Sequence, residues 1–133
     1  IKSGELAKFI QEFGKDYAVI VLDLSPSLTA PLAQAIEVAD LFILPMRNNL
    51  HDLRGALQIS SIVGSIKTLA LQIGATDPIS SDFEFIDCAI SLSEEVENSQ
   101  SGNVSVLTSS KTSSIAENFR EATYSILEKL DLL

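Results

Sequence analysis

The pattern of hydrophobic and polar positions predicts a helix and then a strand at the start of the chain. Residues 5–13 carry apolar side chains at helical spacing, with Ser3 placed to cap the helix and Gly14 placed to end it. Residues 17–22 form a continuous apolar run rich in β-branched side chains. A run that is short, apolar throughout and preceded by a helix is typical of a strand buried on both faces of a parallel sheet.

The next elements complete a strand–helix–strand pattern. A helical stretch over residues 28–38 leads to a second apolar run at 41–46, which predicts a βαβ unit with a right-handed crossover. Apolar positions from 50 to 71 again share a helical spacing, so we expect a long helix there. Gly55 and Gly64 weaken that helix by roughly 1 kcal/mol each relative to alanine, which makes them candidate points for a break.

The second half of the chain predicts further helices and strands. The expected elements are loops at 74–78 and 80–82, strands at 83–90 and 103–107, and helices at 91–100 and 114–130. The last helix carries one apolar face, which we expect to pack on the sheet as the closing element. Together the elements indicate one α/β domain over residues 1–133, with a mostly parallel sheet flanked by helices.

Composition is that of a folded domain with an acidic surface. The chain has 133 residues, of which 46% are hydrophobic and 20% charged. Asp and Glu number 18 against 9 Lys and Arg, which gives a net charge of −9. This balance argues against nucleic acid or an anionic membrane as the main partner of this piece, because both bind through an excess of cations.

Single residues and the ends of the chain exclude several other classes. One cysteine, Cys88, and one histidine, His51, rule out a disulfide framework, a cysteine-rich zinc site and a multi-histidine metal cluster. No apolar run approaches the length of about 20 residues that a membrane span needs, and no basic stretch precedes an apolar run at the start. We therefore expect a cytoplasmic location. Because the chain opens at Ile1, we also expect it to be part of a longer protein.

Asp23 is the first candidate functional residue, because it follows the predicted strand at 17–22 directly. Ligands of doubly wound folds bind beyond the carboxyl ends of the strands. A carboxylate at such a position is costly unless a cation, water or backbone N–H groups compensate it. Two interpretations remain open: Asp23 caps the turn that follows, or it holds Mg²⁺ or orients a nucleophilic water.

Two segments resemble a known family at this point. Residues 17–28 read Y-A-V-I-V-L-D-L-S-P-S-L, similar to the Y-D-x-V-I-I-D-T-P-P-S-L segment of the ParA/Soj/MinD group of deviant-Walker P-loop ATPases. Residues 39–45 then match that family's A-D-x-V-I-x-P segment, and 53–55 match its L-x-G at the start of a long helix. The end of the chain, 93–130, also resembles the family's end.

The resemblance implies a fold, an activity and partners. It implies a partial P-loop NTPase-like fold and, in the intact protein, an ATPase that uses ATP and Mg²⁺ to segregate plasmid or chromosomal DNA or to position a cargo. It also implies a homodimer, a ParB-like protein partner and nonspecific DNA binding. Asp23 would be the catalytic and Mg²⁺-shell carboxylate, and Pro26 would shape the turn beside the nucleotide. Arg47, Arg54 and Lys67 are candidates for a DNA-facing surface.

The chain departs from the family at the phosphate site. The family's Gly-rich K-G-G-x-G-K-T loop, whose backbone N–H groups cradle the phosphates, does not occur in this sequence, and neither does its D-x-D-x-Q motif. Leu24 and Ser25 stand where the family has Thr-Pro. We therefore expect this chain alone to be inactive and to bind no cofactor by itself. The alternative is a nucleotide-free ParA-like module that binds a protein partner. The acidic end of the last helix argues against docking on a membrane.

Overall fold

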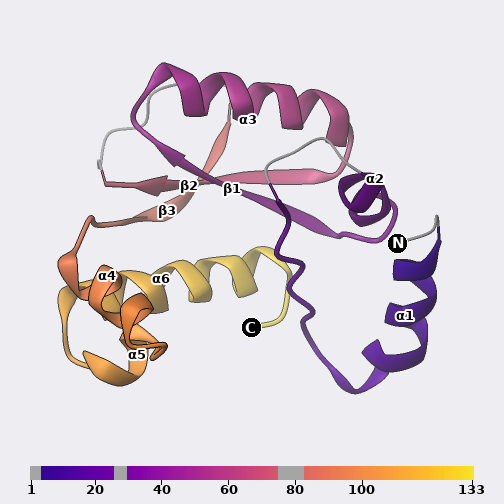
Figure 1. Ribbon diagram of the computed structural model, residues 1–133. Coiled ribbons are helices and arrows are strands. Elements are labelled where there is room, and N and C mark those ends of the chain that lie inside the picture. The colour runs from indigo at the N-terminus through magenta and orange to yellow at the C-terminus, as the bar shows by residue number, and fades with distance from the viewer. Residues whose placement is uncertain (1–3, 26–29, 75–82) are drawn as a thin grey trace. The chain divides into compact units, whose positions relative to one another are not determined.

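The computed structural model describes residues 4–25, 30–74 and 83–133. The chain forms two compact units, Ile1–Asp40 and Leu41–Leu133, and each is described here by itself. Figure 1 shows a helical first unit and a second unit in which helices flank a small sheet. The described strands therefore all lie in the second unit.

The first unit contains the predicted first helix and a second short one. Helix α1 spans Glu5–Phe13, as expected, and a 3₁₀ turn, η1, follows at Gly14–Asp16. The helix starts after Gly4, whose φ of 78° suits glycine, and Ser3 lies outside the described residues. Helix α2 spans Ala30–Ile36, within the range predicted for it. The two helices are linked by the backbone N–H of Leu6, which donates to Gln34 Oε1 at 3.1 Å.

The prediction of a buried strand at residues 17–22 was wrong. The segment is extended but forms no strand, and Tyr17 and Val21 are 69% and 85% exposed. A strand exists only where a neighbouring strand accepts its N–H groups and donates to its carbonyls. No described segment pairs with residues 17–22, so these residues form no strand despite their high β propensity. The predicted βαβ unit that used this strand is therefore absent from the described residues.

The second unit is built on a three-stranded parallel sheet in the order β1-β2-β3. The strands are β1 (Leu41–Arg47), β2 (Lys67–Ile73) and β3 (Glu84–Ile90). Strands β1 and β2 pair in regular register from Leu41↔Lys67 to Arg47↔Ile73. Both β1 and β3 match predicted strands, and the parallel α/β class is confirmed.

Helix α3 (Leu50–Val63) connects β1 to β2 and ends earlier than expected. The predicted helix over 50–71 is correct in its first part, but residues 67–73 are the central strand. Gly64 stops the helix, with φ 70° and ψ −119°, a backbone conformation that residues with a side chain rarely adopt. The break follows from this backbone geometry, because the apolar spacing continues past it.

Three helices follow the last strand: α4 (Glu94–Ser101), α5 (Val106–Ser109) and α6 (Ser114–Lys129). Helices α4 and α6 were predicted, but the strand expected at 103–107 was wrong. Ser105 instead accepts a hydrogen bond from Leu107 N and caps α5, whose Val106 is buried. The alternating apolar residues Val104 and Val106 therefore do not mark a strand: Ser105 between them caps α5, and Val106 is buried as the first residue of that helix.

Helices cover both faces of the sheet (Figure 1), and apolar side chains pack between each face and its helix. On the α3 face, Met46 and Ala70 pack with Ala56 of α3. On the opposite face, Ile90 packs with Ile115 and Ala122 of α6, so α6 closes the sheet as predicted. In the described part of the chain, no helix is both long enough and apolar enough to cross a bilayer.

Candidate functional site at the carboxyl edge of the sheet

The parallel strands end together at one edge of the sheet. Their last residues are Arg47, Ile73 and Ile90, and the described turns after β1 and β3 carry hydrogen-bonded polar side chains. In open α/β sheets this edge is where ligands bind, because the carboxyl ends and the loops after them leave a polar, accessible margin. This edge is the candidate site.

Gln72 places an amide group in the apolar layer next to this edge. It is the penultimate residue of the central strand, pairs in register with Met46, and is 4% exposed. Strand alternation puts it on the same face as Ala70, beneath α3. Its Nε2 and Oε1 are both buried and have no hydrogen-bond partner in the described structure. A buried amide with neither donor nor acceptor satisfied is uncommon and costly, which marks it as a candidate ligand contact.

The turn after β1 is organised around the start of α3. Asn49 Oδ1 accepts from the backbone N–H of Asp52 at 2.8 Å, and Asp52 Oδ2 accepts from the backbone N–H of Arg47 at 2.9 Å. The hydrogen bond from Arg47 N–H lowers the pKa of Asp52, and the nearby His51 adds to that effect. His51 itself is exposed, with Nδ1 3.6 Å from Asp52 Oδ1. Asn49 therefore caps α3, the Asp52 side chain holds the turn at the end of β1, and His51 is a surface residue.

The turn after β3 is tied to α6 by Asn118. Its Oδ1 accepts from the backbone N–H of Ser91 at 3.2 Å, and its backbone carbonyl lies 3.8 Å from Cys88 Sγ. Partial burial, together with the charges of Glu121 and Asp87, raises the pKa of the Cys88 thiol. A raised thiol pKa disfavours the reactive thiolate, so Cys88 behaves as the small apolar side chain that its neighbours predicted.

Asp23 is not part of the unit that carries the sheet. Asp23 belongs to the first unit and is exposed in a segment with no helix or strand, while Pro26 lies outside the described residues. Mg²⁺ takes an octahedral set of oxygens, of which proteins supply one or two carboxylates and substrate phosphates supply others. Within residues 4–25, 30–74 and 83–133, no group of three or more metal-ligating side chains forms.

The three cations proposed for a DNA-facing surface do not form one patch. Arg47, Arg54 and Lys67 are all exposed. However, Arg47 ends β1, whereas Lys67 pairs with Leu41 at the opposite end of the same ladder. At roughly 3.3 Å per residue these two positions are about 20 Å apart along the strands. A continuous basic surface from these residues is therefore not present.

Sequence reasoning missed Gln72 and Asn118. Gln72 lies just past the end of the helix predicted over 50–71, so it was assigned to no element. The signal that was available is the β-branched and apolar character of the residues after Gly64, which favours a strand. Asn118 carried no signal, because its role depends on where α6 meets the end of β3.

No family model, curated protein or solved structure gives a significant match to this chain. Fold and site together define an α/β chain with an open three-stranded parallel sheet and a polar carboxyl edge.

Proposed function

We propose that this chain is the C-terminal portion of a ParA-like, P-loop NTPase-like ATPase. In the intact protein this activity would drive DNA or plasmid segregation or the positioning of a cargo, in a homodimer stimulated by a ParB-like partner. The observation that carries the proposal is the order of the matching motifs along a parallel unit. Ala39-Asp40 directly precede β1, Pro45 lies within β1, and Leu53-Arg54-Gly55 lie in the first half of α3.

The proposal gives the residues of this chain limited roles. Phosphoryl transfer in such enzymes depends on positioned charges and a water in line with the γ-phosphate. Asp23 would hold or orient that water through its carboxylate, and Pro26 would shape the turn after it. The phosphate loop would come from outside this sequence.

The experiment is binding of a fluorescent ATP analogue with Mg²⁺ to the intact gene product. Asp23→Asn should weaken Mg²⁺-dependent binding or abolish hydrolysis. The matched variant Glu37→Gln, which also neutralises one exposed carboxylate of the first unit, should change neither. If the intact product binds no nucleotide, the ATPase proposal is wrong.

The second candidate is a nucleotide-free module that binds a protein partner. The exposed apolar surface of the first unit favours it, because large apolar side chains left in water mark interaction surfaces. In this case Asp23 is a turn residue, and both Asp23→Asn and Glu37→Gln are silent in every nucleotide assay. Nucleotide binding by the intact product therefore separates the two candidates.

A further inference from the structure

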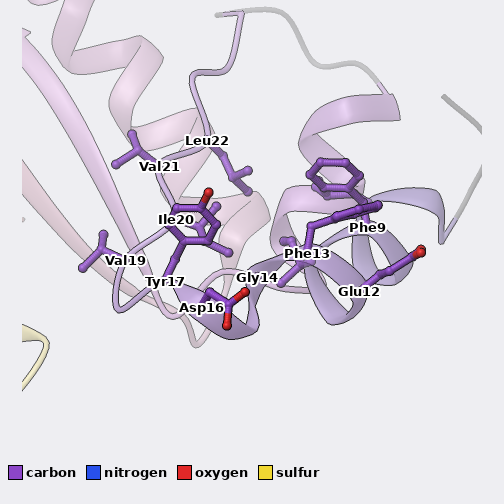
Figure 2. Close-up of a pocket in the computed structure, with 12 residues that line it drawn as sticks. Phe9, Glu12, Phe13, Gly14, Asp16, Tyr17, Val19, Ile20, Val21 and Leu22 are labelled. Carbon is purple, nitrogen blue, oxygen red and sulfur yellow. The ribbon is translucent and has the colours of Figure 1, made fainter.

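The first unit contains an apolar groove of about 680 Å³ between α1 and the extended segment that follows it. Figure 2 shows Phe9 and Phe13 of α1 on one side and residues 19–22 on the other. Gly14 allows the segment to approach the helix, because a Cβ at this position would lie 2.8 Å from Ile20 Cδ1. The helix and the segment therefore approach each other closely where Gly14 meets Ile20.

The walls of the groove remain largely in water. Helix α1 has no buried residue, although its apolar side chains form a continuous stripe. Phe9 and Phe13 stack with ring centroids 4.9 Å apart and are 60% and 54% exposed. Tyr17 and Val21 on the facing segment are still more exposed. Apolar surface of this extent, contributed by two neighbouring segments, is typical of a docking site.

Charge indicates what kind of partner fits. Among the residues that the structure describes, the charged ones that line the groove are Glu12 and Asp16, and none is Lys or Arg. In Figure 2 Asp16 lies at the turn between α1 and the facing segment, and Glu12 lies on α1 with its carboxylate directed away from residues 19–22. The chain as a whole carries a net charge of −9, so a second copy or an anionic lipid surface would be repelled. A cationic partner is attracted both by Glu12 and Asp16 and by the net negative charge of the whole chain.

We propose that this groove binds an amphipathic segment of a protein partner, with aliphatic side chains on one face and Lys or Arg beside them. The aliphatic side chains fill the space between the Phe9–Phe13 pair and residues 19–22, as in other grooves that accept an amphipathic helix. The cations of the partner lie against Glu12 and Asp16. This inference rests on the partner-binding candidate above and specifies the surface and the chemistry of the partner.

The test uses a fluorescein-labelled helical peptide with Leu on one face and Lys on the other, titrated with the full chain and followed by anisotropy. Val21→Ser removes apolar surface from a segment without helix or strand, so it leaves the helices intact. We expect about tenfold weaker binding, as for truncation of a central apolar contact. Phe13→Ser should act in the same direction. Tyr124→Ser, which removes an equally exposed aromatic ring from α6, should have no effect.

Charge is tested separately. The double variant Glu12→Gln/Asp16→Asn should weaken binding of the Leu–Lys peptide several-fold and reduce its salt dependence, since two of the facing charges are gone. Glu94→Gln/Glu97→Gln removes the same charge from α4 and should change binding little. A matched Leu–Glu peptide should bind far more weakly than the Leu–Lys peptide.

Each other outcome overturns the proposal in an identifiable way. Equal binding of the Leu–Glu peptide contradicts the charge argument but leaves partner binding at the groove intact. If Val21→Ser and Phe13→Ser leave the affinity for the peptide unchanged, the peptide binds elsewhere on the acidic chain and the proposal is wrong. If the chain does not bind the peptide at all, the proposal is also wrong. Self-association of the chain that Val21→Ser abolishes assigns the groove to a second copy. The nucleotide assay is unaffected by any of these results.

Discussion

Replacing Gln72 by methionine should stabilise the protein. The Gln72 side chain is buried on the central strand, and its amide nitrogen and oxygen have no partner in the described structure. Methionine has nearly the same length and flexibility but carries no group that needs a hydrogen bond. The substitution therefore keeps the packing beside Met46 and Ala70 and removes the buried polar atoms.

The size of the effect follows from the cost of an unsatisfied buried group. Leaving a buried donor or acceptor without a partner costs about 1–3 kcal/mol. Because both amide atoms of Gln72 are buried without partners and the substitution breaks no hydrogen bond, we expect Gln72→Met to raise the free energy of unfolding by about 1–2 kcal/mol. For a domain of this size that corresponds to a Tm increase of about 3–8 °C.

The assay is urea unfolding followed by circular dichroism, with Gln34→Met as the matched control. Gln34 is as deeply buried as Gln72, at 4% exposure, but its Oε1 accepts from Leu6 N–H. Removing that acceptor should destabilise the protein by about 0.5–1.5 kcal/mol, so the same substitution has opposite signs at the two sites. If Gln72→Met lowers the urea midpoint at unchanged m-value, the amide is bonded in solution and the reasoning is refuted.

Three further predictions concern single interactions. Gly64→Ala should lower the free energy of unfolding by about 1–2 kcal/mol, because the positive φ of Gly64 favours glycine. Gly55→Ala, inside α3, should raise it by about 0.5–1 kcal/mol. If urea unfolding shows that both substitutions change the free energy in the same direction, this reasoning is contradicted. The hydrogen bond from Lys129, at 2.7 Å, lowers the pKa of Glu84, so its stabilisation exists above the ordinary value of 4.5 and is lost as pH falls through the lowered value. In Lys129→Met the free energy of unfolding should fall less as the pH is lowered from 4.5 through this range. NMR titration should show that the pKa of Glu84 is higher in the variant. Because partial burial raises the pKa of Cys88, iodoacetamide at pH 8 should alkylate it more slowly than free cysteine; an equal rate would disprove the assignment.

The elements that could be predicted from sequence are those decided by local pattern. Helix α1, strand β1, strand β3 and helix α6 each carry a periodicity with a clear boundary, and all four were located correctly. The boundary at Gly64 could be suspected but not decided, because apolar residues after it fit either a helix or a strand. What decides it is the backbone conformation that Gly64 adopts.

The features that could not be predicted depend on distant parts of the chain. Residues 17–22 have the composition of a strand, but a strand also requires a neighbour. Gln72 reads as an ordinary polar residue until β2 is known to be the central strand, covered on both faces. The candidate site is thus a product of topology, and its residues carry no motif of their own.

The two proposals for function make opposite demands on residues 17–22. An ATPase of the proposed kind needs this segment as a paired strand, because only then does Asp23 stand at the carboxyl end of a sheet. Val19, Ile20, Val21 and Leu22 all line the groove beside α1. In a paired strand alternate side chains point to opposite faces of the sheet, so pairing would take part of this lining away from the groove. Amide hydrogen exchange of Val19 to Leu22 in the intact gene product distinguishes the two states. We expect slow exchange with Mg²⁺ and nucleotide if the segment pairs, together with loss of Leu–Lys peptide binding. Fast exchange alongside tight nucleotide binding would contradict a strand role for this segment and, with it, the assignment of Asp23.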